Sequence, residues 1–251
     1  TMSEAVPSVV YKSIGTHSGQ FHCDEAAAIF MLQQLPAFKN AAIFRSRDQA
    51  FLDTLDVLVD VGSVYDHNAL RYDHHQRSFG ETFSSKSDIK LSSAGLVYKH
   101  YGLEFLQTLF NQPSFTKNVS EKQLNDIKAI LNTETWQQIY SEFYKRIISS
   151  FDAIDNGVSQ YSEIQEPKYI DNTSISKRVA RLNDSWTTSL YYSAEQKEQL
   201  AALAAEGKEA LPQFYKAINI VGEELTEQVF DLIFNWLPAQ SYVSNAVKDR
   251  F

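Results

Sequence analysis

Residues 57–62 read VLVDVG, one aspartate within an apolar run that ends in glycine. A nearly continuous apolar run of this length is typical of a strand buried on both faces, as in a parallel sheet. Further strands are expected at residues 9–15, 41–45 and 70–74. Helices are expected between or after them, at residues 24–35, 49–55 and 92–101, the last ended by Gly102. Because strands alternate with helices, the sequence predicts an α/β fold with a doubly wound, mostly parallel sheet.

The pattern becomes helical after Ser120. Apolar residues recur there at spacings of three and four, which predicts one buried stripe on a long helix or a helix pair. The stripe comprises Ile127, Leu131, Ile139, Phe143, Ile147, Phe151 and Ile154. Further helical segments are expected at residues 174–182, within 193–236 with a break near Pro212, and at 239–251. We therefore predict an α/β domain over residues 1–158, including the long helices after 120, and a helical C-terminal region over 159–251.

The composition excludes several classes of protein. With 43% hydrophobic residues, the chain of 251 residues can build a sizeable core, which excludes a largely disordered protein. A single Cys excludes a disulfide framework and a zinc site made of several cysteines. The longest apolar run, residues 26–32, is far shorter than the roughly 18 residues of a membrane-spanning helix, so no membrane partner is expected. The N-terminus has neither a signal nor a transit pattern, which predicts an intracellular, cytoplasmic protein.

Histidine and aspartate gather where the expected strands end. The clusters are HSGQFHCDE at residues 17–25, VDVG at 59–62 and DHHQ at 73–76. The carboxyl ends of the strands form the ligand-binding edge of an open α/β sheet. Imidazole combined with carboxylate suits Mn, Fe or Zn, and paired metals can activate a water for attack at phosphorus. The candidate ligands are His17, His22, Asp24, Asp60, His74, His75, Asp152 and Asp155.

Three smaller features suit phosphate binding, and two of them also have a simpler explanation. Ser92 and Ser93 precede a helix, where hydroxyls and free backbone N–H groups bind anions, although a plain N-cap explains them equally. Arg178 and Arg181 share one helix face and would hold a phosphate, or else form a solvated surface. Arg77, just after DHHQ, would stabilise charge that develops during catalysis.

The ordered set HSGQFHCDEA at 17–26, VDVG at 59–62 and DHHQ at 73–76 resembles the DHH phosphoesterase superfamily. The closer resemblance is to its melanocyte-proliferating-gene branch, whose eukaryotic members are described as metal-dependent 3′→5′ RNA exonucleases. Matching segments continue along the chain as KLSSAGLVYKHYG, DAIDNGVSQY, SKRVARLN and WLPA. The resemblance covers nearly all of this chain, and it implies a DHH-type fold.

The resemblance also implies a set of site residues. One metal would be held by His17, His22 and Asp60, and the other by Asp24, Asp60, His74 and Asp155, with Asp152 as the rival of Asp155. His75 would contact the reacting phosphate. His22 stands where most of the superfamily has Asp, so a nitrogen-rich site favours Mn over Mg. The superfamily's Gly-rich C-terminal motif is absent from this sequence, which implies that the chain ends before a substrate-holding domain or that this domain has diverged.

The sequence therefore predicts a phosphodiesterase, a 3′→5′ exonuclease on RNA or short single-stranded oligonucleotides, that uses a hydroxide bridging two divalent metals. Asp60, His75 and Arg77 are the expected catalytic residues. The net charge of −8 excludes a long nucleic acid held by phosphate neutralisation alone. Two alternatives stay open: a phosphohydrolase of pyrophosphate, cyclic dinucleotides or nucleotide phosphates, and a metal-bound regulatory module without turnover. The resemblance also leaves a nuclear or mitochondrial location open, because members of the family are placed there. A homodimer is open as well.

Overall fold

A five-stranded sheet forms the centre of the N-terminal half. The structure, a computed structural model, describes residues 9–161 and 168–248. The strands are β1 (Ser13–Thr16), β2 (Ala42–Arg45), β3 (Val57–Val59), β4 (Tyr65–Asp66) and β5 (Arg71–Tyr72). Their order in the sheet is β2-β1-β3-β5-β4, and all neighbours are parallel except β4 and β5. The mixed α/β class and the mostly parallel sheet are therefore confirmed, while a doubly wound arrangement of the DHH type stays a prediction.

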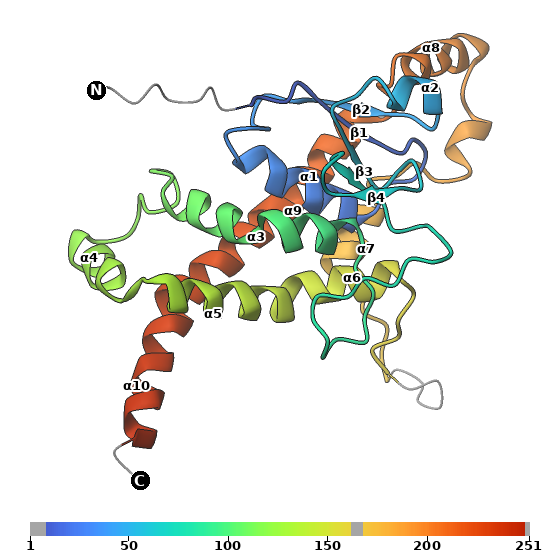
Figure 1. Cartoon of the computed structure of the whole chain (residues 1–251). Helices are drawn as coiled ribbons and strands as arrows, with labels where there is room; N and C mark the ends of the chain where they lie inside the picture. The colour runs from blue at the N-terminus through green and yellow to red at the C-terminus, as the bar shows by residue number, and fades with distance from the viewer. Residues whose placement is uncertain (1–8, 162–167, 249–251) are drawn as a thin grey trace, which may run out of the picture.

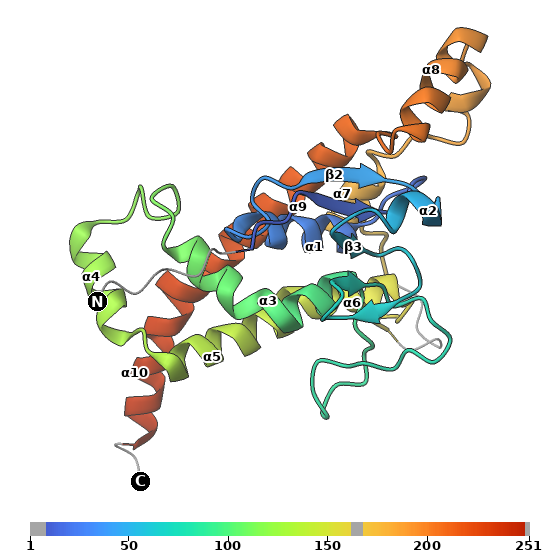
Figure 2. The same cartoon turned by 45° about the horizontal axis from the view of Figure 1, so that its top comes forward.

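Alternate residues of β3 fill two different cores. Val57 and Val59 belong to the large core cluster that also holds apolar residues of α1 (Cys23–Gln34) and α3 (Ser93–Phe110). Leu58 points to the opposite face and packs with Leu52 of the short helix α2 (Gln49–Leu52) and with Leu55. Side chains of a strand alternate between its two faces, so both faces of this strand are buried, as the run VLVDVG indicates. Figure 2 shows α1 and α3 on one side of the strands.

Helix α3 is much longer than the predicted segment 92–101 and runs through Gly102 to Phe110. Gly102 does not end the helix; it lets two aromatic rings approach the helix backbone. A Cβ atom at this position would lie 2.6 Å from the ring of Tyr98 and 2.9 Å from that of Tyr140. The prediction of a C-terminal glycine stop was therefore wrong, because tertiary packing explains the glycine.

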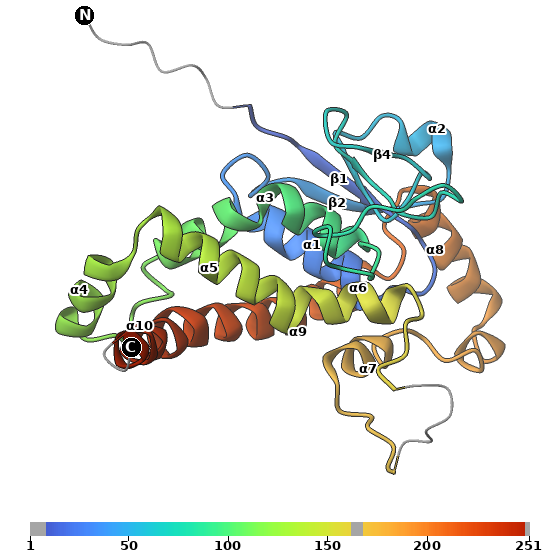
Figure 3. The same cartoon turned by 60° about the horizontal axis from the view of Figure 1, so that its bottom comes forward.

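The remaining helices and helical turns are α4 (Glu121–Ile130), α5 (Thr133–Phe143), the π-helical turn η1 (Tyr144–Ile148), α6 (Ser149–Asp155), α7 (Ile175–Ala180), the 3-10 turn η2 (Thr188–Leu190), α8 (Ala194–Ala205), α9 (Leu211–Asp231), the π-helical turn η3 (Leu232–Trp236) and α10 (Leu237–Lys248). Of these, α5, α6, α7 and α9 pack against α1 or α3, whereas Figure 1 shows α8 apart from them, near α2. Helix α9, from the region predicted as C-terminal, crosses α1 and packs against it. Figure 3 shows α9 and α10 as a nearly continuous rod below α5.

One detail of the helical predictions needs correction. Ile154, the last residue of the predicted apolar stripe, is 55% exposed, whereas Phe151 and Ile139 are buried. The predicted break near Pro212 is confirmed: α8 ends at Ala205 and α9 begins at Leu211, with Pro212 in the first turn of α9, where a missing N–H is harmless. The predicted segment 239–251 is helical up to Lys248, and residues 249–251 lie outside the described residues. Over the described parts of the chain, the helices are too short or too polar to cross a membrane.

Candidate metal centre

Three parallel strands end at the same edge of the sheet, and a candidate ligand follows each of them. His17 comes directly after β1, Asp60 directly after β3, and His74 two residues after β5. Because these strands are hydrogen-bonded neighbours that run in one direction, their ends lie side by side. Asp60 leaves its strand in the left-handed region, with a φ of 57°. The topology alone therefore brings together side chains that are between 14 and 57 residues apart in the sequence.

Asp60 lies at the centre of this group. Its Oδ2 is 3.2 Å from Nε2 of His17, and its Oδ1 is 3.4 Å from Nε2 of His74. The hydroxyl of Ser93 donates to Oδ1 at 3.2 Å and also to the backbone carbonyl of Tyr72 at 3.0 Å. Burial alone would raise the pKa of the Asp60 carboxyl, but the hydrogen bonds from the two imidazoles outweigh burial and hold this pKa below its usual range. Asp60 is therefore an ionised carboxylate shared by two histidines.

The start of α1 buries carboxylates that lack protein partners. Neither Oδ of Asp24 has a hydrogen-bond partner among the described residues, and the same holds for Oε2 of Glu25. The other oxygen of Glu25 accepts from the backbone N–H of His22 at 2.8 Å and lies 3.1 Å from Nε2 of His17. Burial raises the pKa of Asp24 far above its usual value, and the nearby carboxylates Asp60, Asp155 and Glu25 raise it further. Partnerless buried carboxylates of this kind fit a divalent cation, which would neutralise them.

Three groups of side chains within the described residues place their ligand atoms within 4.8 Å of one another. They are His17, His22, Glu25 and Asp60; Asp60, His74 and His75; and His22, Asp24 and Asp155. Asp60 belongs to the first two groups and His22 to the first and third, so the groups are joined through shared residues. Mixed nitrogen and oxygen donors suit Mn, Fe or Zn. The donor set therefore fits divalent metal binding, and it adds Glu25 to the residues expected from the sequence.

Asp152 and Asp155, three residues apart on α6, have different surroundings. Oδ1 of Asp152 accepts from the backbone N–H and the hydroxyl of Ser92, both at 2.8 Å, and from the N–H of Gly95 at 3.1 Å. Its Oδ2 accepts from the hydroxyl of Tyr144 at 2.9 Å. Asp155, in contrast, places Oδ2 2.9 Å from Nε2 of His74. The geometry thus favours Asp155 as the ligand and gives Asp152 the task of holding the start of α3.

The ring of His75 faces solvent, while its Nδ1 atom is held by a neighbouring carboxylate. Its Nδ1 lies 2.7 Å from Oδ1 of Asp73, and the other oxygen of Asp73 accepts from the N–H of Ser63 at 2.6 Å. The side chain of His75 is 59% exposed. The hydrogen bond to Asp73 is the main reason why the pKa of His75 is raised. This arrangement leaves Nε2 of a readily protonated ring free to meet an anionic substrate.

The other phosphate-binding candidates lie in less favourable places. Ser92 is fully buried with its hydroxyl bound to Asp152, so the structure gives it the N-terminal anchoring role rather than an open anion site. Arg77 is exposed in the turn after β5, and no ion pair involving it is found among the described residues. Arg178 is exposed on α7, and Nη1 of Arg181 donates to the carbonyl of Asn172 at 2.6 Å. None of the three arginines belongs to the metal groups.

The loop between His17 and His22 is held by residues that the sequence reading missed. The side-chain amide of Asn183 forms two hydrogen bonds with the backbone of Phe21, one accepted at 2.9 Å and one donated at 2.8 Å. The buried Arg45 donates to the carbonyl of Gly19 at 2.7 Å and to that of Glu209 at 2.9 Å. Asn183 and Glu209 come from the C-terminal part of the chain. That part therefore positions the first ligand loop, which no local sequence signal could show.

Two further residues escaped the sequence reading although a signal existed. Glu25 follows Asp24 directly, but Glu three residues after an N-cap reads as part of a capping box, and it does accept from the N–H of His22. Asp73 is the first residue of DHHQ and was assigned no function, yet it fixes the ring of His75. Such carboxylate partners commonly orient functional histidines.

Comparisons with known proteins agree on one family. The family model described as MYG1_exonuc, an uncharacterised protein family (UPF0160), matches residues 13–251. A protein named MYG1 exonuclease in Homo sapiens is 38% identical over 243 residues, which covers 95% of this chain and 55% of that relative. MYG1 proteins of Caenorhabditis elegans and Dictyostelium discoideum are 38% and 37% identical, each over 95% of this chain and over 61% and 62% of the relative. The chain thus spans somewhat more than half the length of these relatives. No solved structure matches it.

Proposed function

This chain belongs to the MYG1 exonuclease family, and from that premise we propose that it is a metal-dependent phosphodiesterase, a 3′→5′ exonuclease on RNA or short oligonucleotides. The word exonuclease in the names of its mammalian relatives supports the nuclease part of the proposal. The order of the motifs at the strand ends supports a relationship to the DHH phosphoesterases.

One observation carries the proposal: buried carboxylates without protein partners lie beside histidines that share Asp60. The residues that would hold divalent cations, Mn by preference, are His17, His22, Asp24, Glu25, Asp60, His74 and Asp155. Such cations would polarise the oxygens of a phosphodiester and lower the pKa of water. A structural role alone does not explain why oxygens of Asp24 and Glu25 are left without donors, since buried carboxylates are normally hydrogen-bonded.

The residues of the chain have distinct tasks in this scheme. Ser93 donates to Asp60 and so fixes the orientation of the shared carboxylate. Asp73 holds Nδ1 of His75, which directs Nε2 towards solvent and allows it to donate to a phosphoryl oxygen as negative charge develops there. With a net charge of −8 the chain as a whole does not attract a long polyanion, so a short or single-stranded substrate held near the centre fits best.

The direct test is hydrolysis of a 5′-labelled RNA oligomer by the purified chain with Mn²⁺. We expect progressively shorter labelled products and release of 5′-mononucleotides. Asp60→Asn should lower the rate by at least about 10³-fold, because it weakens a ligand shared by two groups. Asp126→Asn is the matched control, since Asp126 is exposed on α4, far from the site, and pairs with Lys122.

Each result decides between the readings. Release of orthophosphate from pyrophosphate or a nucleotide phosphate, with the oligomer left intact, would replace the nuclease by a small-molecule phosphohydrolase. Bound metal without hydrolysis of any of these substrates would favour a regulatory module. An Asp60→Asn variant as active as Asp126→Asn would contradict the role given to the shared carboxylate.

A further inference from the structure

A cavity of about 290 Å³ lies next to the candidate metal centre, between the start of α1, helix α6 and helix α7. His22, Asp24 and Asp155 line one part of it, and these three residues also form one of the groups able to hold a cation. Figure 3 shows α7 below the end of α6, and residues of both helices line the cavity. A molecule inside the cavity would therefore touch the metal group directly.

Lys177 supplies positive charge to this cavity. It is the one Lys or Arg among the described residues of the lining, and its side chain is exposed on α7. In the described parts of the chain no carboxylate forms an ion pair with it. An ammonium that lines the same cavity as Asp24 and Asp155 is suited to bind an anion that also approaches the metal group.

The wall next to Asp155 is apolar. Ile154 is 55% exposed although it continues the buried stripe of the preceding helix, and it lines the cavity together with Phe151 and Ala180. An exposed isoleucine beside a candidate ligand gives a flat apolar contact for a sugar or a base. Ligand sites usually measure about 300–1,000 Å³, so this cavity is small and suits one nucleotide rather than a duplex.

We propose that this cavity is a subsite for one nucleotide of the substrate, in which Lys177 pairs with the phosphate next to the scissile one and Ile154 contacts the sugar or base. The inference rests on the proposed phosphodiesterase function and extends it. It names the preferred substrate class as oligonucleotides that carry a phosphate on the nucleotide adjoining the cleaved bond. It also places the phosphate-binding cation on Lys177 rather than on Arg178 or Arg181.

The test compares the RNA dinucleotide ApA with its 5′-phosphorylated form pApA, both with Mn²⁺ and the whole chain. ApA carries only the scissile phosphate, whereas pApA carries a second one for Lys177. We expect kcat/KM for pApA to exceed that for ApA by about tenfold, the effect of one hydrogen-bonded ion pair. Lys177→Met, which keeps the length of the side chain, should bring this ratio to about one, and Lys177→Arg should keep most of it.

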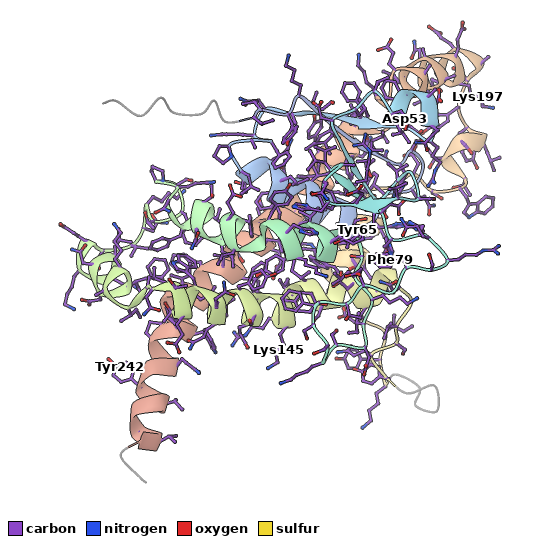
Figure 4. The ribbon with its side chains drawn as sticks, viewed as in Figure 1. Asp53, Tyr65, Phe79, Lys145, Lys197 and Tyr242 are labelled. Atoms are coloured by element: carbon purple, nitrogen blue, oxygen red, sulfur yellow. The ribbon has the colours of Figure 1, made fainter. Side chains whose placement is uncertain are left out.

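The matched control is Lys145→Met. Lys145 is 77% exposed in η1, and Figure 4 shows its side chain pointing away from the body of the molecule. This variant loses the same charge and should keep the tenfold ratio. Calorimetry adds a measurement without turnover: with Mn²⁺, adenosine 5′-monophosphate should bind Lys177→Met about tenfold more weakly than the wild type, whereas adenosine should bind the two proteins equally.

The outcomes separate this inference from the proposed function. Hydrolysis of both dinucleotides with a ratio that Lys177→Met leaves unchanged would overturn the subsite and leave the phosphodiesterase standing. An equal loss on both dinucleotides would assign Lys177 to the scissile phosphate and would also overturn it. Hydrolysis of neither dinucleotide, nor of a longer oligomer, by the wild type would overturn the proposed function itself. Thermal unfolding of each variant shows whether a loss of activity reflects a loss of fold.

Discussion

The N-termini of α1 and α3 both bury carboxylates, but in opposite ways. At α3, Asp152 accepts from two N–H groups and two hydroxyls, so each of its oxygens has a protein donor. At α1, both oxygens of Asp24 and one of Glu25 have no donor among the described residues. Burial is nearly complete in both places. The difference shows that the fold can satisfy a buried carboxylate where its role is structural, and that it leaves one unsatisfied where a cation is expected to complete the site.

The largest effect should come from removing the satisfied carboxylate. Asp152→Ala leaves the N–H groups of Ser92 and Gly95 and the hydroxyl of Tyr144 without their acceptor, which should lower the free energy of unfolding by about 3 kcal/mol. Urea unfolding of the metal-free chain measures this loss. Mn²⁺ affinity of the folded variant should stay within about threefold of the wild type. If Asp152→Ala lost much of its Mn²⁺ affinity while its free energy of unfolding stayed unchanged, Asp152 would be a metal ligand. The difference between the two helix N-termini would then be refuted.

The opposite change is expected at α1. In the metal-free chain, Asp24 must be buried either charged or with an added proton, so Asp24→Asn should raise the free energy of unfolding at pH 7 by about 2 kcal/mol. The same variant should show a smaller rise in Tm when Mn²⁺ is added, because a ligand is lost. Thermal unfolding with and without Mn²⁺ measures both effects. A variant less stable than the wild type without metal would mean that Asp24 does have a stabilising partner.

A third test concerns the loop that contains His17 and His22. Asn183→Ala removes both hydrogen bonds to the backbone of Phe21, which should weaken Mn²⁺ binding by about tenfold, as is usual for groups that orient metal ligands. Titration with Mn²⁺ measures the affinity. Asn111→Ala is the control, because the side-chain amide of Asn111 also donates to a backbone carbonyl, that of Gln107, but at the C-terminal end of α3. Equal affinities in the two variants would show that the loop keeps its shape without Asn183.

The smallest expected effect is a pH dependence specific to Asp152. Burial raises the pKa of Asp152 to about 6 in the folded chain, so the folded state binds a proton that the unfolded state has already released near pH 5. Stability from this group is present at low pH and is lost as the pH rises through 6. The metal-free wild type should gain about 1 kcal/mol between pH 7 and pH 5 relative to Asp152→Asn. Parallel urea unfolding curves for the two proteins across this range would refute the shift.

The positions of the strand ends could be predicted from sequence because the signal for a buried strand lies within the strand itself. The apolar run of residues 57–62 identifies a buried strand, and parallel strands necessarily bring their carboxyl ends to one edge. The same logic placed His17, Asp60 and His74 in one neighbourhood. What pattern reading could not decide depends on partners far away in sequence. Asp152 differs from Asp155 largely through donors some sixty residues earlier, at Ser92 and Gly95.

Long-range packing also explains the other differences. Gly102 reads as a helix stop, yet the rings of Tyr98 and Tyr140 account for it. Ile154 reads as core because its spacing fits the stripe, but the helix face it occupies has reached the edge of the body by then. Asn183 carries no local signal, because its partner Phe21 lies 162 residues away. In each case the local sequence pattern describes the helix or loop itself. It does not show which distant segment packs against it.

The left-handed backbone at Asp60 has a consequence for anyone who wishes to alter this protein. With a φ of 57°, position 60 is open without strain mainly to Gly, Asn and Asp. A larger or β-branched residue would disturb the chain path at the end of β3 before its own chemistry mattered. Mutant libraries that aim at new catalytic properties should therefore keep position 60 fixed and vary the residues around it. The Asp60→Asn variant can serve as the inactive reference.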